Sequence, residues 1–179
     1  MSAGDGLLLP GKRRLATLGA GQGGRADVVV DDFRERWAKM ESVELNNTLQ
    51  EDWHAAPDSG SEWSHCPVAP LYITTMSLAG IQPLEPGFAR CEIRPQRADL
   101  EQLELTVRTV QGPIEFRSRG MIGSRELTLQ LPSGCEGELA VSGKENLELE
   151  NSVGAIARGG LARYRIPAGK TTAVHLRYT

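Results

Sequence analysis

The second half of the chain alternates apolar and polar residues in short runs. Leu103, Leu105 and Val107 are separated by charged or hydroxyl-bearing residues, which is the period of two expected of a half-buried strand. Glycine-containing turns separate this run from the later ones. The predicted strands cover 103–109, 113–119, 126–131, 138–142, 155–158, 162–166 and 172–178. About seven or eight short strands at this spacing predict an antiparallel β-sandwich.

The first half of the chain has a helical period instead. Val29, Phe33, Trp37 and Met40 recur at steps of three and four residues, so the spacing predicts one helix from Asp27 to Glu41 with a single apolar stripe. Trp37 lies on this stripe and is expected in the core, where large aromatic side chains are commonly buried.

A second helix is predicted from Pro67 or Val68 to Ala79, with Ser64 as a cap and Gly80 as its end. It is apolar around most of its circumference, and we expect it to be buried. The apolar positions are Val68, Leu71, Tyr72, Met76 and Leu78. Such a helix needs other helices around it, and this chain supplies few.

These patterns predict an α+β chain in three parts. Residues 1–24 are rich in glycine and alanine and are expected to be poorly ordered. Residues 25–87 carry the helices, and residues 88–179 form the sandwich. The change in period places the domain boundary near 80–87.

Composition limits the function classes. A chain of 179 residues with 40% hydrophobic residues, 24% charged residues and a net charge of −3 is ordinary for a globular protein. Nucleic acid is not an expected partner, because phosphate binding needs a concentrated basic face. No apolar run approaches the roughly 20 residues that cross a bilayer, so no membrane association is expected. The N-terminus does not resemble a secretory signal, which predicts a cytoplasmic protein if that terminus is the natural one.

The three cysteines are widely spaced. Cys66, Cys91 and Cys135 include no CxxC pair, so we expect buried free thiols in preference to a disulfide framework or a zinc site. No cofactor is predicted.

The segment from Asn47 to Pro70 concentrates the candidate chemistry. It contains acids, two histidines and two tryptophans within two dozen residues. Aromatic faces stack on the apolar face of a sugar, while carboxylates and imidazoles bind its hydroxyl groups and transfer protons. The segment lies between the two predicted helices, where a loop can present such groups.

Other interpretations of this segment remain open. Glu51 and Asp52 also fit a solvated acidic turn. His65 beside Cys66 suggests a thiol nucleophile with its base, but adjacent residues at a helix start point apart. A metal site can be drawn from His54, Asp58, Glu62 and His65, although their spacing matches no metal motif.

On the predicted sheet, several charged residues alternate with apolar ones, and we expect them on a solvated face. They are Arg108, Glu115, Arg117 and Arg119. His175 alternates with Val174 and Leu176, so it is also expected to point outward.

Four motifs, taken in order, resemble the C-terminal part of bacterial-type α-L-rhamnosidases of glycoside hydrolase family 78. They are GRADVVVDDFRERWAKM, NTLQEDW, SEWSHCPVAPLYITTMSLAGIQPLEPGF and EIRPQ. The resemblance covers about residues 24–132. It implies a few last helices of an (α/α)6 barrel followed by a C-terminal β-sandwich, and hydrolysis of terminal α-L-rhamnosides with inversion.

The resemblance also implies roles for particular residues. Glu51 matches the glutamate assigned as the general base, Trp53 the tryptophan after it, and His65 a sugar-contacting histidine. Trp63 is added as a substrate-binding candidate because of its polar neighbours. The chain departs from the family at Gln50, where a tryptophan is common, and at Cys66 and Val68.

A full twelve-helix barrel needs several hundred residues. We therefore expect a fragment of a hydrolase for a rhamnose-containing carbohydrate, inactive alone because the general acid lies on other sequence. The alternatives are a non-catalytic carbohydrate-binding or structural sandwich, and complementation by a chain that supplies the rest of the barrel.

Overall fold

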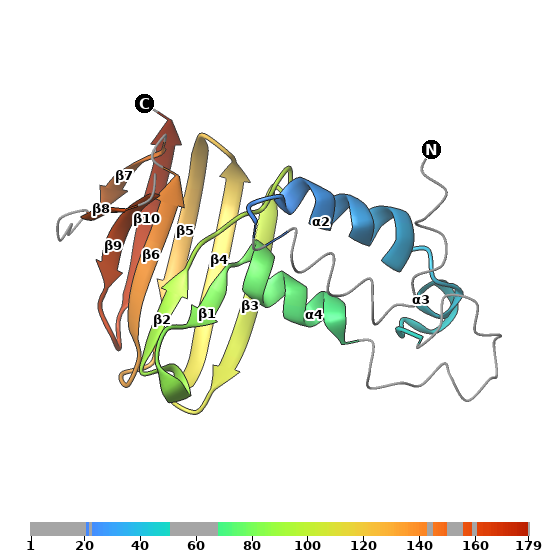
Figure 1. Ribbon diagram of the computed structural model, residues 1–179, viewed down its shortest axis with the longest axis horizontal. Helices are drawn as coiled ribbons and strands as arrows, with labels where there is room; N and C mark the ends of the chain where they lie inside the picture. Colours follow the sequence, from blue (N-terminus) through green and yellow to red (C-terminus); the bar gives the residue numbers. More distant parts are fainter. Residues whose placement is uncertain are drawn as a thin grey trace. The chain divides into compact units, whose positions relative to one another are not determined.

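The computed structural model describes residues 21, 23–50, 68–142, 145–149, 156–158 and 161–178 (Figure 1). The chain divides into two compact units, residues 1–74 and residues 75–179. Most of the segment 1–24 lies outside the described residues, so its predicted lack of order stays a prediction.

The first predicted helix is present but ends at Trp37. It comprises α2 (Ala26–Asp32) and the π-helical turn η2 (Phe33–Trp37), and a separate helix α3 (Glu41–Asn46) follows. Met40 between them is extended, with φ −66° and ψ 135°. The predicted helix is confirmed from Ala26 to Trp37, but its predicted end at Glu41 was wrong, because the hydrophobic period does not reveal that Met40 is extended while its side chain stays buried.

The apolar stripe of this region is confirmed. The exposed fractions are 0% for Val29, 3% for Trp37 and 2% for Met40, and Phe33 is half-buried. The prediction that Trp37 belongs to a core is therefore confirmed, and its ring is not available as a platform for sugar.

The second predicted helix is present as α4 (Ala69–Ile73) and a π-helical continuation, η4 (Thr74–Leu78). Ile73 and Leu78 are buried, but Leu71 is 72% exposed and Tyr72 49% exposed. The expectation of burial on all sides was therefore wrong. One face carries the buried residues, and an apolar face remains in contact with water.

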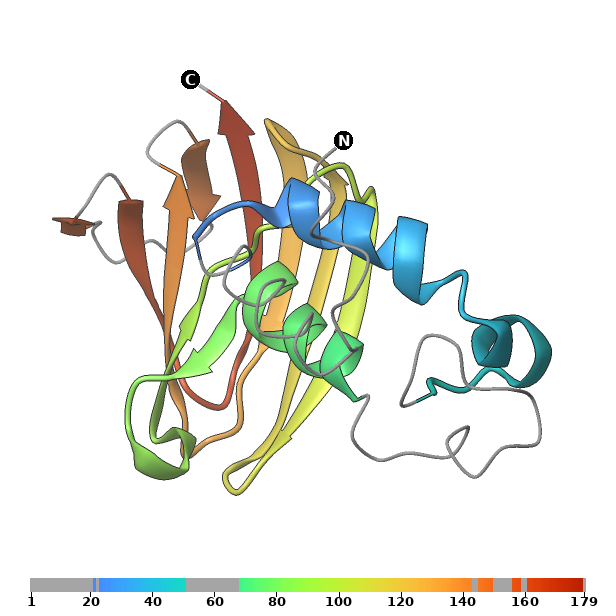
Figure 2. The ribbon, with the colours of Figure 1, turned by 45° about the vertical axis from the view of Figure 1, so that its right-hand side comes forward.

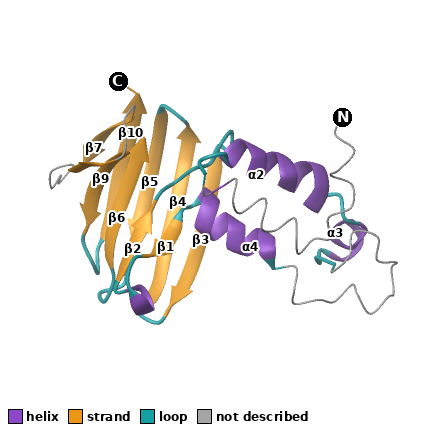
Figure 3. Ribbon diagram, viewed as in Figure 1, coloured by secondary structure: helices purple, strands orange, loops and turns teal. Residues whose placement is uncertain are grey.

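The second unit is a sandwich of two five-stranded sheets. Its strands are labelled in Figure 1 and coloured orange in Figure 3. Sheet A has the order β1 (Ile81–Pro83), β2 (Arg90–Ile93), β6 (Glu136–Ser142), β9 (Leu161–Ile166) and β8 (Ile156–Arg158). Sheet B has the order β3 (Gln102–Thr109), β4 (Gly112–Met121), β5 (Ser124–Gln130), β10 (Thr171–Tyr178) and β7 (Glu145–Leu149). A short 3-10 turn, η5 (Pro86–Phe88), joins β1 to β2.

The sandwich and the α+β class are thus as predicted, with one difference in pairing. β2 and β6 are parallel, with Cys91 opposite Gly137, while the other paired strands are antiparallel. The chain leaves sheet A after β2, forms three strands of sheet B, and returns beside β2 in the same direction. A parallel pair requires such a crossover.

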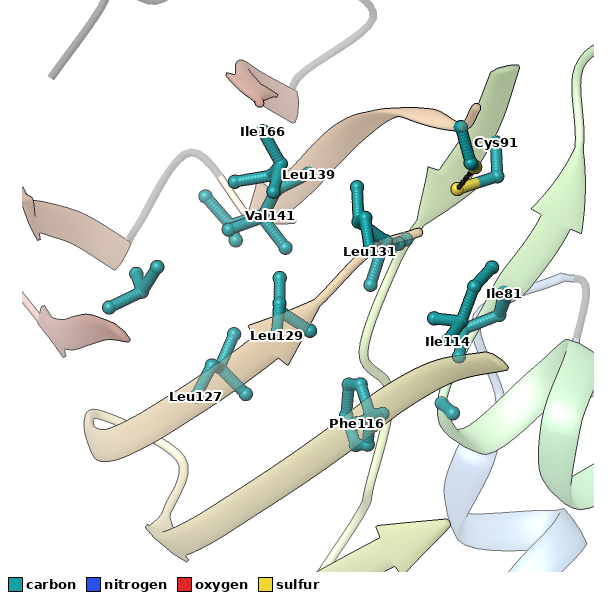
Figure 4. Close-up of a cluster of buried hydrophobic side chains, with 14 of the residues drawn as sticks. Ile81, Cys91, Ile114, Phe116, Leu127, Leu129, Leu131, Leu139, Val141 and Ile166 are labelled. Carbon is teal, nitrogen blue, oxygen red and sulfur yellow. Dashed lines mark hydrogen bonds between the residues drawn. The ribbon is translucent and has the colours of Figure 1, made fainter. Parts of the chain in front are cut away.

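The core lies between the sheets (Figures 2 and 4). Alternate residues of β4 and β5 point into it from sheet B, and residues of β6 and β9 meet them from sheet A. The fully buried side chains include Ile114, Phe116, Leu127, Leu129, Leu139 and Ile166. Burying each side chain of this size contributes about 1.5–3 kcal/mol, so this core is the main source of the unit's stability.

Two buried arginines fix the connection between β2 and β3. Arg97 is 1% exposed, and its Nη1 and Nη2 donate hydrogen bonds to the carbonyls of Ser118 (3.3 Å) and Gly120 (2.6 Å). Nη1 of Arg125 donates to the Pro95 carbonyl at 3.4 Å. Guanidinium groups with carbonyl acceptors tolerate burial, and here they tie the crossing segment to sheet B.

Candidate functional site

The site residues predicted from the sequence lie outside the described residues. Glu51, Trp53, Trp63 and His65 all fall within 51–67, as do Cys66 and the alternative metal ligands. Their roles stay predictions. The structure does describe both ends of this segment, up to Gln50 and from Val68 onward.

The residues before Glu51 fold back on α3. Asn47 has a left-handed backbone, with φ 53°, and its amide donates to the Val43 carbonyl. The Thr48 amide then donates to the Ser42 carbonyl at 3.1 Å, and Ser42 Oγ donates to the Thr48 carbonyl at 2.8 Å. Asparagine tolerates this conformation better than most residues, so the sequence NT suits the turn. These bonds fix the path of the chain that leads to the predicted general base.

Gln50 has a structural role at this point. Its side chain is 1% exposed, and Oε1 accepts a hydrogen bond from the Ser42 amide at 3.1 Å. Ser42 lies in the first turn of α3, where backbone amides have no partner within the helix. The glutamine thus satisfies a helix amide.

A buried carboxylate lies in the π-helical region of the first unit. Asp32 is 4% exposed, and its Oδ2 accepts a hydrogen bond from Trp37 Nε1 at 3.1 Å. Arg36 Nε lies 3.7 Å from Asp32 Oδ1. The Ala38 amide bonds to the Phe33 carbonyl five residues earlier, and this wide turn brings residues five apart toward one face. Both carboxylate oxygens have partners, so Asp32 orients the indole of Trp37.

A polar hollow lies on the outer face of sheet B. The register sets Arg119 opposite Glu126 and Glu126 opposite His175, and Arg177 and Ser124 line the same hollow. His175 Nδ1 lies 3.5 Å from Glu126 Oε1. The prediction that Arg119 and His175 face solvent is confirmed by their exposure. Sequence analysis missed the hollow, because period-two alternation gives the face of each residue but not the register between strands.

Two of the three thiols meet in the core. Cys91 and Cys135 are buried and free, as predicted, and their Sγ atoms are 3.5 Å apart (Figure 4). Burial in the apolar core raises the pKa of both thiols, and for Cys91 the contact with Cys135 adds to the increase.

Among the described residues, no group of three or more histidine, cysteine or acidic side chains is placed to hold a metal ion. In the same part of the chain, every helix is too short or too polar to span a bilayer.

Comparison with known families and structures identifies relatives. Residues 80–155 match the sequence model of the bacterial alpha-L-rhamnosidase C-terminal domain. The alpha-L-rhamnosidase of Streptomyces avermitilis, solved as a complex with L-rhamnose, is similar to 87% of this chain with a TM-score of 0.63 and 18% identity. The enzyme of Dictyoglumus thermophilum is similar over 92% of the chain with a TM-score of 0.69 and 17% identity. That of Aspergillus terreus is similar over 94% with a TM-score of 0.55 and 14% identity. No curated protein sequence matches the chain.

The similarity covers nearly all of this chain but a small part of each relative. The matched regions are 16%, 21% and 19% of those three proteins. At such identities the solved structures show the fold, and the family match is confined to the sandwich and the residues before it. The chain is therefore similar to the C-terminal part of a bacterial-type α-L-rhamnosidase, as the motifs predicted.

Proposed function

We propose that this chain is the C-terminal section of an α-L-rhamnosidase-like glycoside hydrolase whose substrate is a rhamnose-containing carbohydrate. The observation that carries the proposal is the match of residues 80–155 to the rhamnosidase C-terminal domain, directly after the helical motifs of the same family. The chemistry belongs to the segment before α4.

Within that segment, Glu51 is the general base that activates water. Trp53 and Trp63 stack against the sugar ring, and His65 binds a hydroxyl group. The hydrogen bonds of Ser42 with Thr48 and Gln50 support this assignment, since they anchor the residue immediately before Glu51. A general base needs such positioning, because proton transfer depends on geometry before pKa.

An inverting hydrolase requires a second carboxyl group roughly 6.5–9.5 Å from the first. Asp32 is the buried carboxylate of the described residues, and both its oxygens are engaged by Trp37 and Arg36. We assign the general acid to sequence outside this chain. The isolated chain is then inactive, because positioned proton transfer supplies about 10²- to 10⁴-fold per group.

The exposed apolar face of α4 supports the same view. Leu71 and Tyr72 of α4 are 72% and 49% exposed, and Val68, which caps the helix, is 50% exposed. Apolar residues gathered on one helix face mark a surface that another element covers. The rest of the barrel, on the same polypeptide or on another chain, is the partner that we propose for this face.

The test is an assay of the isolated chain with 4-nitrophenyl α-L-rhamnoside, beside the Glu51→Gln variant. We expect equal and negligible release of nitrophenol from both. Turnover by the wild-type chain that Glu51→Gln abolishes would show that no essential group is missing. Titration with L-rhamnose, followed by tryptophan fluorescence, then tests the sugar contacts. Binding should be lost in Trp53→Ala and retained in Tyr164→Ala, whose ring packs against the sandwich core.

A non-catalytic carbohydrate-binding sandwich is the alternative. The polar hollow around Glu126 and His175 favours it. Against it, Phe116 is fully buried and Tyr164 packs on the core, so neither ring is a free stacking platform. Rhamnoside binding that survives Trp53→Ala but is lost in Glu126→Ala would favour the alternative.

A further inference from the structure

The two core thiols come from segments that are distant in the sequence and adjacent in sheet A. Cys91 lies in β2, and Cys135 immediately precedes β6, the parallel neighbour of β2. The Glu136 amide donates to the Ala89 carbonyl at 3.0 Å, and this bond joins the two segments beside the sulfur atoms.

The two sulfur atoms are in direct contact. Their separation of 3.5 Å exceeds the S–S bond length of about 2.05 Å by roughly 1.5 Å. Rotation about the two Cα–Cβ bonds, with a small backbone adjustment, can cover such a difference. Both cysteines belong to the same cluster of buried residues.

We propose that Cys91 and Cys135 are a dithiol that a disulfide oxidant converts to an intramolecular disulfide, tying β2 covalently to the start of β6. The oxidant is a small-molecule or protein disulfide. One cysteine thiolate attacks a sulfur of the oxidant, whose S–S bond breaks, and the released thiolate takes up a proton. The second cysteine gives up its proton and attacks the mixed disulfide, which releases the second thiol. The cysteines lose two electrons and two protons, and the oxidant disulfide gains them.

Access to the pair controls the rate. Both thiols are fully buried, and burial raises the pKa of each. The native protein, with β2 paired to β6, therefore offers almost no thiolate to an oxidant. β1 is the edge strand of sheet A and has three residues, and β2 beside it has four. Separation of this short pair from β6 exposes Cys91 without unfolding sheet B. The reaction is then slow in the native protein, and the bond holds the edge of sheet A closed once it has formed.

The test uses the full chain with Cys66→Ser, which leaves only these two thiols. The protein is incubated with excess oxidised glutathione, and the reaction is quenched with acid. The protein is then denatured and treated with N-ethylmaleimide, and its intact mass is measured by mass spectrometry. We expect no alkylation, no glutathione adduct, and a mass lower by two hydrogen atoms. Dithiothreitol should restore two alkylation sites.

Thermal unfolding supplies a second measurement. The bond closes a loop of about 45 residues, for which restriction of the unfolded chain predicts a midpoint raised by at least about 5 °C. In the matched control, Cys135→Ser in the same background, the oxidant should leave Cys91 free or as a glutathione adduct, without this rise. Cys66→Ala replaces Cys66→Ser if the latter does not fold.

Several results would overturn the proposal. Both thiols remaining free after prolonged exposure to glutathione disulfide would show that the pair does not react. A persistent glutathione adduct in the protein with both cysteines would show that the second sulfur cannot reach the first. A disulfide that leaves the midpoint unchanged or lowers it would show that the bond does not fit the native sandwich.

Discussion

The backbones of Gly80 and Arg94 are in direct contact where the second helix ends and the sandwich begins. The Arg94 amide donates a hydrogen bond to the Gly80 carbonyl at 3.0 Å, and a Cβ atom on Gly80 would overlap the Arg94 carbonyl oxygen. Gly80 also has a left-handed backbone, with φ 68°. The next residue, Ile81, begins β1 and pairs with Ile93 of β2. This contact therefore sets the register of the first two strands of sheet A.

Replacement of Gly80 by alanine should reduce the free energy of unfolding by about 3 kcal/mol or more. The left-handed conformation costs about 1–2 kcal/mol for a residue with a Cβ, and the overlap with backbone forces β1 away from β2. Urea denaturation followed by far-UV circular dichroism measures the loss.

Gly169→Ala is the matched control for this prediction. Gly169 has the same φ of 68°, but a Cβ there would lie 3.5 Å from the Ser133 Cα, an ordinary contact. The control should lose only about 1–2 kcal/mol, the cost of the conformation. Equal losses in the two variants would mean that the contact with Arg94 contributes nothing.

Replacement of Arg97 by lysine should destabilise the sandwich by about 2–4 kcal/mol. Lysine keeps the positive charge but has no planar guanidinium to donate to the carbonyls of Ser118 and Gly120 together, so these hydrogen bonds to a buried side chain are lost. Arg117→Lys is the control, because Arg117 is 56% exposed and pairs with Glu104 at the surface. That change should cost less than about 0.5 kcal/mol. Similar urea midpoints for the two variants would contradict the role of Arg97.

Strands β3, β4, β5 and β10 of sheet B were predictable because one face of each meets water, whereas β7 was not predicted. β3 alternates throughout and β4 as far as Arg119, so Leu103 and Val107 mark the inner face and Arg117 the outer one. β2 was missed because it has only four residues, RCEI, too few to show an alternating pattern. β1 was missed because Pro83 ends a three-residue edge strand, which a search by composition treats as a loop.

The helical half shows a different limit. The apolar stripe that contains Val29 and Trp37 identified the buried face correctly. The three- and four-residue spacing of its apolar side chains gave no indication of the π-helical turn or of the extended Met40. Those features depend on contacts of individual side chains, such as that of Trp37 with Asp32. Likewise, the sequence suggested the chemistry of the site through residue types, whereas the role of Gln50 required the fold of the segment after α3.

Replacement of Gln50 by methionine should destabilise the first unit by about 1–2 kcal/mol. Methionine keeps the volume but removes the acceptor of the Ser42 amide, which leaves a buried donor without that bond. Tryptophan fluorescence during thermal unfolding reports the change through buried Trp37. Leu45→Met, at a position of α3 that is 62% exposed, should unfold close to the wild type. An unchanged midpoint for Gln50→Met would show that the hydrogen bond does not support α3.

Stability should fall as the pH rises above about 9, and Cys91 should be one cause. Burial raises the pKa of the Cys91 thiol above its ordinary value of 9.0, so the folded state keeps the proton while the unfolded chain releases it. The contribution of Cys91 to the free energy of unfolding is complete below the ordinary thiol pKa. It is lost as the pH rises toward the pKa of Cys91 in the folded state, at up to about 1.4 kcal/mol per pH unit. Urea denaturation under reducing conditions at pH 7.5, 9 and 10.5 measures this slope. Cys91→Val keeps an apolar side chain and has no proton to lose, so its stability should decline less steeply than that of the wild type. Parallel declines would mean that the burial of this thiol is not linked to folding.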